Sequence, residues 1–79
     1  MTLRKFLDLY DSWYDRVVIN DNNLNMIVEG VIANIMERTA EFRFDSSVND
    51  YDILFEMKVV AFGVYDEELC VRVRHGRTN

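Results

Sequence analysis

Apolar residues recur at helical spacing within residues 2–10 of the chain. They are Leu3, Phe6, Leu7 and Tyr10, at positions i, i+3, i+4 and i+7. This spacing puts all four on one side of an α-helix, so it predicts a short helix with one apolar face. Thr2 can cap that helix, because a threonine hydroxyl accepts a hydrogen bond from a backbone N–H of the first turn.

Residues 13–30, with the sequence WYDRVVINDNNLNMIVEG, combine apolar alternation with a central polar cluster and predict a β-hairpin. Asn22 and Asn23 can form its turn, because asparagine tolerates the positive φ angles of a type I′ turn. The cross-strand pairs made by this turn include Val17 with Val28, Ile19 with Met26 and Arg16 with Glu29. Apolar residues then face apolar residues across the hairpin, and a cation faces an anion.

The middle of the chain contains two further stretches with helical spacing. The first is residues 31–39, whose apolar residues Ile32, Ile35 and Met36 predict a short helix. Ser46 and Ser47 can cap the second, in which Tyr51, Leu54 and Phe55 share a face. Between the two, residues 41–45 alternate and predict a brief extended segment.

Residues 62–74, with the sequence FGVYDEELCVRVR, predict a second hairpin. Glutamate disfavours positive φ, so we expect a four-residue loop from Asp66 to Leu69 with Tyr65 opposite Cys70. The inner, apolar face of this hairpin is then formed by Phe62, Val64, Val71 and Val73. The outer face is formed by Tyr65, Cys70, Arg72 and Arg74, with Ala61 and Gly63 leaving room for the arginine side chains.

These elements predict an α+β fold. Two β-hairpins form a four-stranded antiparallel sheet, and two or three short helices lie on one face of it. Seventy-nine residues with an apolar fraction of 49% fit a single compact domain over residues 1–79.

The cysteine content and the lack of a long apolar run favour a cytoplasmic location. Cys70 is the only cysteine, so a disulfide within the chain is impossible, which fits a reducing cytoplasm better than secretion. Residues 1–20 lack a basic start followed by an apolar run, so we expect no signal peptide, and no apolar run approaches the roughly 18 residues that a membrane span needs. We therefore expect a cytoplasmic protein that does not cross a membrane.

The net charge is −5, and the acidic residues are unevenly placed. All fourteen lie between Asp8 and Glu68, together with only four basic residues. An acidic body of this kind repels a nucleic-acid backbone and attracts basic protein surfaces. The simpler interpretation is that the acids keep a small protein soluble.

The sequence predicts no catalytic, metal or cofactor site. Cys70 and His75 are the only combination that resembles a nucleophile and a base, and their odd spacing on a strand sends them to opposite faces. Residues 21–32 and 45–56 resemble parts of a calcium-binding loop, but neither has glycine at its sixth position. We expect both to act as turns and helix caps, and we expect no enzyme.

The arginines near the end of the sequence have three interpretations, of which the favoured one is a solvated face or one paired with Asp66, Glu67 and Glu68 of the same sheet or of a neighbouring copy. Arg72, Arg74 and Arg77 could touch phosphate, but the acidic body and the lack of aromatic residues along this strand make direct nucleic-acid binding an unfavoured interpretation. A homomeric contact is the alternative, with Tyr65, Arg72 and Arg74 on one side and the aromatic residues of the first helix on the other. A homodimer would relieve the marginal stability of so small a domain.

Three segments, FLDLYDSW, VVINDNNLNMIVEG and VVAFGVYDEELCVRV, together resemble the small acidic proteins encoded by phages and prophages. That group includes anti-CRISPR inhibitors, which bind an effector and often offer carboxylates where phosphates would sit. The resemblance implies a non-enzymatic protein that binds and inhibits a bacterial nucleic-acid-handling protein, such as a CRISPR effector, in the host cytoplasm. It assigns no individual residue.

Carboxylates in two segments are the candidates for such a contact. They are Asp45, Asp50, Asp52 and Glu56 in the middle of the chain, and Asp66, Glu67 and Glu68 in the second hairpin. Charge attraction to a basic partner would speed the encounter. The alternative function is a self-associating structural or regulatory phage protein with no inhibitory role.

Overall fold

The structure, a computed structural model, describes residues 1–76, so Arg77 of the proposed arginine cluster lies outside the described part. The elements follow in the order α1 (Leu3–Asp8), β1 (Arg16–Asn20), β2 (Met26–Val31), α2 (Ile32–Met36), α3 (Tyr51–Glu56), β3 (Lys58–Tyr65) and β4 (Glu68–Arg74). The expected helices and hairpins are therefore all present. Thr2 caps α1 as predicted, its hydroxyl oxygen accepting from the N–H of Lys5 at 3.3 Å.

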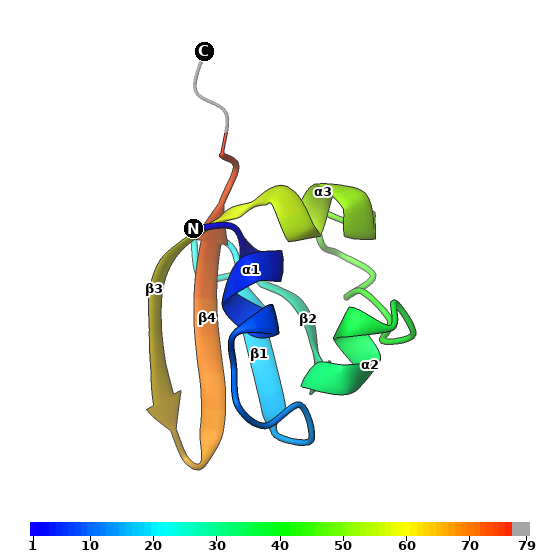
Figure 1. Cartoon of the computed structure of the whole chain (residues 1–79). Helices are drawn as coiled ribbons and strands as arrows, with labels where there is room; N and C mark the ends of the chain where they lie inside the picture. Colours follow the sequence, from blue (N-terminus) through cyan, green and yellow to red (C-terminus); the bar gives the residue numbers. More distant parts are fainter. Residues whose placement is uncertain (77–79) are drawn as a thin grey trace.

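The fold is α+β, but its sheet is mixed, which makes the expectation of a fully antiparallel sheet wrong. The strand order is β2-β1-β4-β3, and β1 and β4 at the centre run parallel, with Val17 beside Leu69. This order places β4 between two strands, where Leu69, Val71 and Val73 are all buried. β3 lies at the edge of the sheet (Figure 1).

The first hairpin has a different register from the one predicted. Val17 pairs with Gly30 and Ile19 pairs with Val28, a shift of two residues that keeps these side chains on their predicted face. A bulge between Ile19 and Asn20 then pairs Met26 with Asn20 instead of Ile19, and Ile27, predicted on the outer side, is buried. The turn is also longer than Asn22-Asn23, and Leu24 is the residue with positive φ, at 66°. The reason is Asp21, whose carboxylate accepts from two backbone N–H groups of the loop at 2.8 and 2.9 Å and so organises it.

The second hairpin closes through a two-residue turn, so the predicted four-residue loop is wrong. Tyr65 pairs with Glu68, and Val64 pairs with Leu69. Asp66 and Glu67 form the turn with φ angles of 52° and 65°. Positive φ at both positions is the type I′ geometry, whose twist matches that of the paired strands, and here it prevails over the side-chain preference. The outer face still carries Cys70 and Arg72, as expected.

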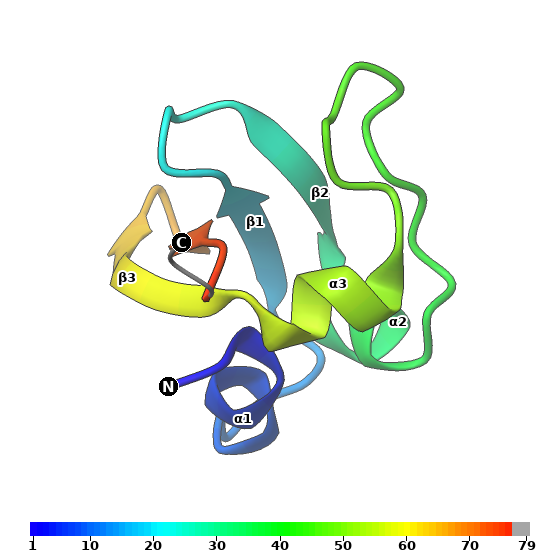
Figure 2. The same cartoon turned by 90° about the horizontal axis from the view of Figure 1, so that it is seen from above.

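Figure 2 shows the three helices gathered on one side of the curved sheet. The core lies between them, and its fully buried members include Leu3, Leu7, Ile19, Val28, Ile32, Ile35, Leu54 and Val71. The free edge of β2 meets the middle segment of the chain, where Phe42 forms a bridge with Val28. This bridge is the only extended pairing made by the segment predicted over residues 41–45.

The cap of α3 differs from the predicted one. Asp50 is the N-cap, and its carboxylate accepts from the N–H groups of Asp52 at 2.7 Å and Ile53 at 3.4 Å. Ser46 instead accepts from the N–H of Val48 at 3.1 Å, in the loop before the helix. The predicted inner face of α3 is confirmed, because Leu54 and Phe55 are buried.

No helix within residues 1–76 is long and apolar enough to span a bilayer.

Candidate functional site

The two acidic segments singled out from the sequence lie at opposite ends of the sheet. The turn Asp66–Glu67 leads into the start of β4, whereas α3 leads into the start of β3, and these two strands are antiparallel. Figure 1 accordingly shows the β3–β4 turn at the bottom of the molecule and α3 at the top. The molecule measures 35 Å along its longest axis, so the two segments do not form one surface.

Other acidic residues gather at the end that carries the β3–β4 turn. Because β1 and β4 are parallel, the loop that leads into β1 lies at the same end as the turn that leads into β4 (Figure 1). Six residues from three segments form what we call the acidic end: Asp11, Asp15, Glu29, Asp66, Glu67 and Glu68. All are exposed except Glu68, which is half-buried, and in the part of the chain that the structure describes the one basic residue among them is Arg16.

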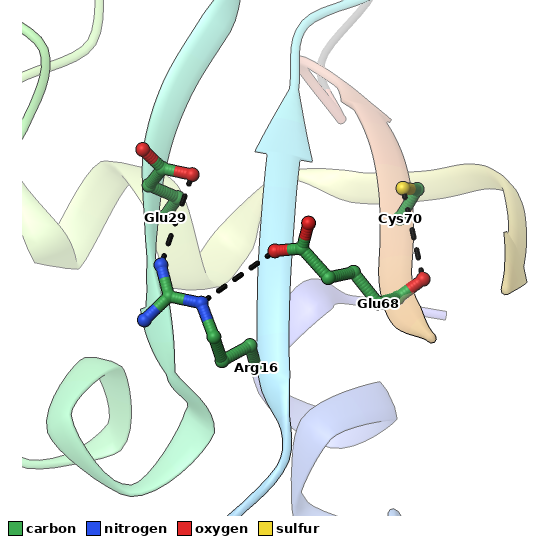
Figure 3. Close-up of polar contacts among 4 residues, drawn as sticks. All are labelled: Arg16, Glu29, Glu68 and Cys70. Carbon is green, nitrogen blue, oxygen red and sulfur yellow. Dashed lines mark hydrogen bonds and ion pairs between the residues drawn. The ribbon is translucent and has the colours of Figure 1, made fainter. Parts of the chain in front are cut away.

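Arg16 lies across the central strands and contacts two of these carboxylates (Figure 3). Its Nη2 is 3.8 Å from Oε2 of Glu29 on β2, and its Nε is 3.5 Å from Oε2 of Glu68 on β4. The Arg16–Glu29 contact expected from the sequence is thus made, although the two residues are not direct cross-strand partners. One cation therefore neutralises part of the acidic end and leaves Asp66 and Glu67 projecting from the turn.

The acidic residues around α3 are more fully engaged within the chain. Asp52 pairs with Arg38, with 2.9 Å between Oδ1 and Nη1, and Asp45 pairs with Arg43 at 3.4 Å. Asp50 caps the helix through its carboxylate. Glu56 is exposed, next to Lys58 at the start of β3 in an open groove. The charge at this end is therefore largely balanced by neighbours.

The proposed homomeric residues share the outer face of the sheet but lie on two strands. Tyr65 is on the edge strand β3 and is 67% exposed. Its ring lies over Gly63, where an added Cβ would come within 3.0 Å of it. Arg72 and Arg74 are on β4, inside the sheet, and Arg74 donates from Nη1 to the carbonyl of its neighbour His75 at 3.1 Å.

A shallow hollow of about 370 Å³ lies on this outer face, between the β1–β2 turn and strands β3 and β4. Its lining includes Asn20, Leu24, Tyr65, Cys70 and Arg72. Cys70 donates weakly from Sγ to the carbonyl oxygen of Glu68 at 3.8 Å (Figure 3). His75 follows the end of β4, so the hollow holds the cysteine without the imidazole.

The pKa of Tyr51 is raised, and its side chain makes packing contacts and a hydrogen bond within the fold. Burial raises the pKa of Tyr51 above its usual value. Its hydroxyl donates to the carbonyl oxygen of Ala40 at 2.6 Å and ties the middle segment to α3. Its ring also packs against Phe42 and Phe55, with centroids 4.6 and 5.5 Å away. These contacts make Tyr51 part of the packing rather than of a reactive site.

Sequence reasoning did not place Asp11, Asp15 and Glu29 at the same end of the sheet as the acidic turn. Their proximity depends on the parallel pairing of β1 with β4, for example of Val18 with Cys70. A parallel pair joins segments that are distant in sequence and leaves no turn signal between them. Local spacing therefore held no sign of this cluster.

The chain matches no protein-family model, no curated protein sequence and no solved structure.

Proposed function

We propose that this chain is a non-enzymatic accessory protein of the phage type. In this proposal it binds and inhibits a bacterial nucleic-acid-handling protein, with a CRISPR effector as the first candidate. The contact is made by the acidic end, whose carboxylates would occupy positions that DNA phosphates otherwise take. The kind of partner is inferred from the resemblance to small acidic phage proteins, and the binding surface is inferred from the arrangement of charges.

The observation that carries the proposal is the concentration of carboxylates at one end of the sheet. Three segments meet there, and within residues 1–76 Arg16 is the only cation among their six acids. Neighbouring like charges on a rigid frame create a strong local field, which attracts a basic surface and speeds the encounter with it. A rigid frame also costs less ordering entropy on binding than a flexible acidic tail.

The turn at the acidic end adds a second argument. Asp66 and Glu67 both adopt positive φ, a region that asparagine and glycine occupy more easily. Two exposed carboxylates are therefore held where an uncharged pair would suit the backbone better. Strained backbone positions of this kind cluster at functional sites, so the acids at this turn are good candidates for a selected role.

The test is affinity capture from bacterial lysates that express different CRISPR effector complexes. The wild-type protein is compared with the double variant Asp66→Asn/Glu67→Gly, which removes two charges and relaxes the turn. A matched control, Asp45→Asn/Glu56→Gln, removes two charges from the opposite end of the molecule.

We expect the wild type and the control to retain one effector in stoichiometric amounts. The turn variant should lose at least about tenfold in affinity, equivalent to about 1.4 kcal/mol. Equal retention by the turn variant and the wild type would refute the role of the acidic end. Capture of no effector by any of the proteins would refute the inhibitor function for the effectors tested.

A further inference from the structure

Strand β3 has an unpaired edge over most of its length. It is the last strand of the sheet, and only its start is covered, where Thr2 bridges Lys58. There the N–H of Leu3 donates to the carbonyl oxygen of Met57 at 2.8 Å, and the N–H of Val59 donates to the carbonyl oxygen of Met1 at 2.9 Å. Within residues 1–76, no segment pairs with this edge beyond Val59.

This open edge carries exposed apolar side chains. Phe62 and Val64 are each 64% exposed, although both are on the face that the helices cover elsewhere. Phe6 of α1 reaches the ring of Phe62, with centroids 4.8 Å apart, but α1 leaves the rest of the strand bare. Residues 59–65 contain neither a charged residue nor a proline, the two features that most often protect an edge strand from pairing.

The geometry of the edge suits pairing with another strand. The one irregularity of β3 falls between Val59 and Ala61, so residues 61–65 form a regular ladder with β4. On the outer face of this ladder, Ala61 and Gly63 are small and offer no obstacle to a neighbouring backbone. Five regular residues with an apolar inner face are sufficient for pairing by strand addition.

We propose that the β3 edge is a self-association site at which a second copy of this chain adds its own β3 in antiparallel orientation. A two-fold axis at Gly63 brings Phe62 opposite the partner's Val64 and Ala61 opposite the partner's Tyr65. The apolar side chains then meet on the inner face, and on the outer face each Tyr65, whose ring lies over its own Gly63, is beside the partner's Ala61. The two sheets become one sheet of eight strands.

Charge complementarity supports a second copy as the occupant. The open stretch is bounded by Lys58 at one end and by the acidic turn Asp66–Glu67 at the other. Antiparallel pairing reverses one copy relative to the other, so each acidic turn lies beside the partner's Lys58. A parallel arrangement would place acidic turn against acidic turn, which like-charge repulsion disfavours.

This contact differs from the homomeric contact expected from the sequence. Tyr65 belongs to both, but Arg72 and Arg74 lie on β4, one strand in from the edge. The two copies meet along the side of β3, and of the acidic end only the turn Asp66–Glu67 lies next to the contact. The inference rests on the open edge of β3 and does not require the proposed inhibitory function.

Sedimentation equilibrium between about 1 µM and 1 mM protein tests the inference, since a small interface gives dissociation constants in that range. The variant Val64→Lys places a charge opposite the partner's Phe62 at a position that is already exposed. Phe44→Lys is the matched control, because Phe44 is 95% exposed and lies in the loop before α3.

We expect the wild type and Phe44→Lys to dimerise as concentration rises, and Val64→Lys to dimerise at least about tenfold more weakly, a loss of about 1.4 kcal/mol. Hydrogen exchange at the amides of residues 60–65 of the wild type should slow over the same concentrations. A wild type that stays monomeric at the highest concentration overturns the inference. So does a Val64→Lys variant that dimerises as well as the wild type.

Discussion

The guanidinium of Arg16 lies 3.5 Å from the carboxylate of Glu68 (Figure 3). This contact joins β1 to β4, which are the first and last strands along the chain and neighbours at the centre of the sheet. It exists because β1 and β4 run parallel and begin at the same end of the molecule. The same pairing gathers the acidic end around a single cation. The central link of the fold and the proposed binding surface therefore have one structural origin.

Replacing Arg16 with glutamine should lower the free energy of unfolding only slightly, while it removes the cation from the acidic end. The side chains of Arg16, Glu29 and Glu68 are 52%, 47% and 38% exposed, and ion pairs of this kind contribute at most about 1 kcal/mol. We expect the free energy of unfolding in urea to fall by less than about 1 kcal/mol at low salt. At high salt the difference should shrink, because screening already weakens the pair in the wild type. A loss several times larger would show that the pair has a structural role that its exposure does not suggest.

The helices and sheet are joined chiefly by apolar packing, and α3 offers a paired test of this. Leu54 is fully buried and its neighbour Ile53 is 48% exposed. We expect Leu54→Ala to destabilise the protein by about 2–5 kcal/mol, because it leaves a cavity in the core. Ile53→Ala should cost less than about 1 kcal/mol in the same urea titration. Similar losses for the two variants would mean that α3 is not docked through the face described here.

The turn variant Asp66→Asn/Glu67→Gly should raise stability. Asparagine and glycine adopt the positive φ angles of a type I′ turn with less strain, so we expect a gain of about 1 kcal/mol in the free energy of unfolding. Thermal or urea unfolding measures it directly. A gain in stability together with a loss of partner binding would separate the folding role of this turn from its binding role. A loss of stability would contradict the turn geometry.

The raised pKa of Tyr51 predicts that the stability of the protein falls at alkaline pH. Burial raises its pKa in the folded state, so the folded protein holds the phenolic proton more tightly than the unfolded chain does. This contribution is complete below the unfolded pKa of about 10 and is lost as the pH rises through the higher folded value. Tyr51→Phe removes this pH dependence, and it also loses the hydrogen bond to Ala40, at a cost of about 0.5–1.5 kcal/mol. Urea titrations of both proteins at neutral and alkaline pH provide the comparison. If the free energy of unfolding changes equally with pH in the two proteins, the raised pKa of Tyr51 is contradicted.

The sequence predicted the local elements well, and it predicted their long-range arrangement poorly. Helical spacing located Leu3 and Leu7 on the buried face of α1, and alternation located Val17, Ile19, Val71 and Val73 on the inner face of the sheet. Both hairpin registers were shifted by two residues, which changes the partners but leaves the side chains on the same face, except at the bulged end of the first hairpin, where Met26 pairs with Asn20. Local pattern thus determines the face of a strand more firmly than its partner.

The turns account for these shifts. At Asp21 a carboxylate bonds to the backbone of its own loop, and at Asp66 strand twist prevails over residue preference, so neither turn follows the simplest rule for its sequence. The candidate site was predictable only in part. Asp66, Glu67 and Glu68 form one cluster because they are adjacent in sequence. Asp11 and Asp15 lie at the same end of the sheet because β1 and β4 pair in parallel, and no local signal predicts that pairing.

The most direct test of the central claim is a competition between this protein and DNA for one purified CRISPR effector complex. Increasing amounts of the wild-type protein are added to the effector bound to labelled target DNA, at low and at moderate salt. We expect the wild type to displace the DNA and the displacement to weaken as salt rises. Asp66→Asn/Glu67→Gly should displace the DNA at least about tenfold less well, a difference of about 1.4 kcal/mol. Simultaneous binding of the protein and the DNA, with neither affecting the other, would contradict the claim that the acidic end takes the place of phosphates.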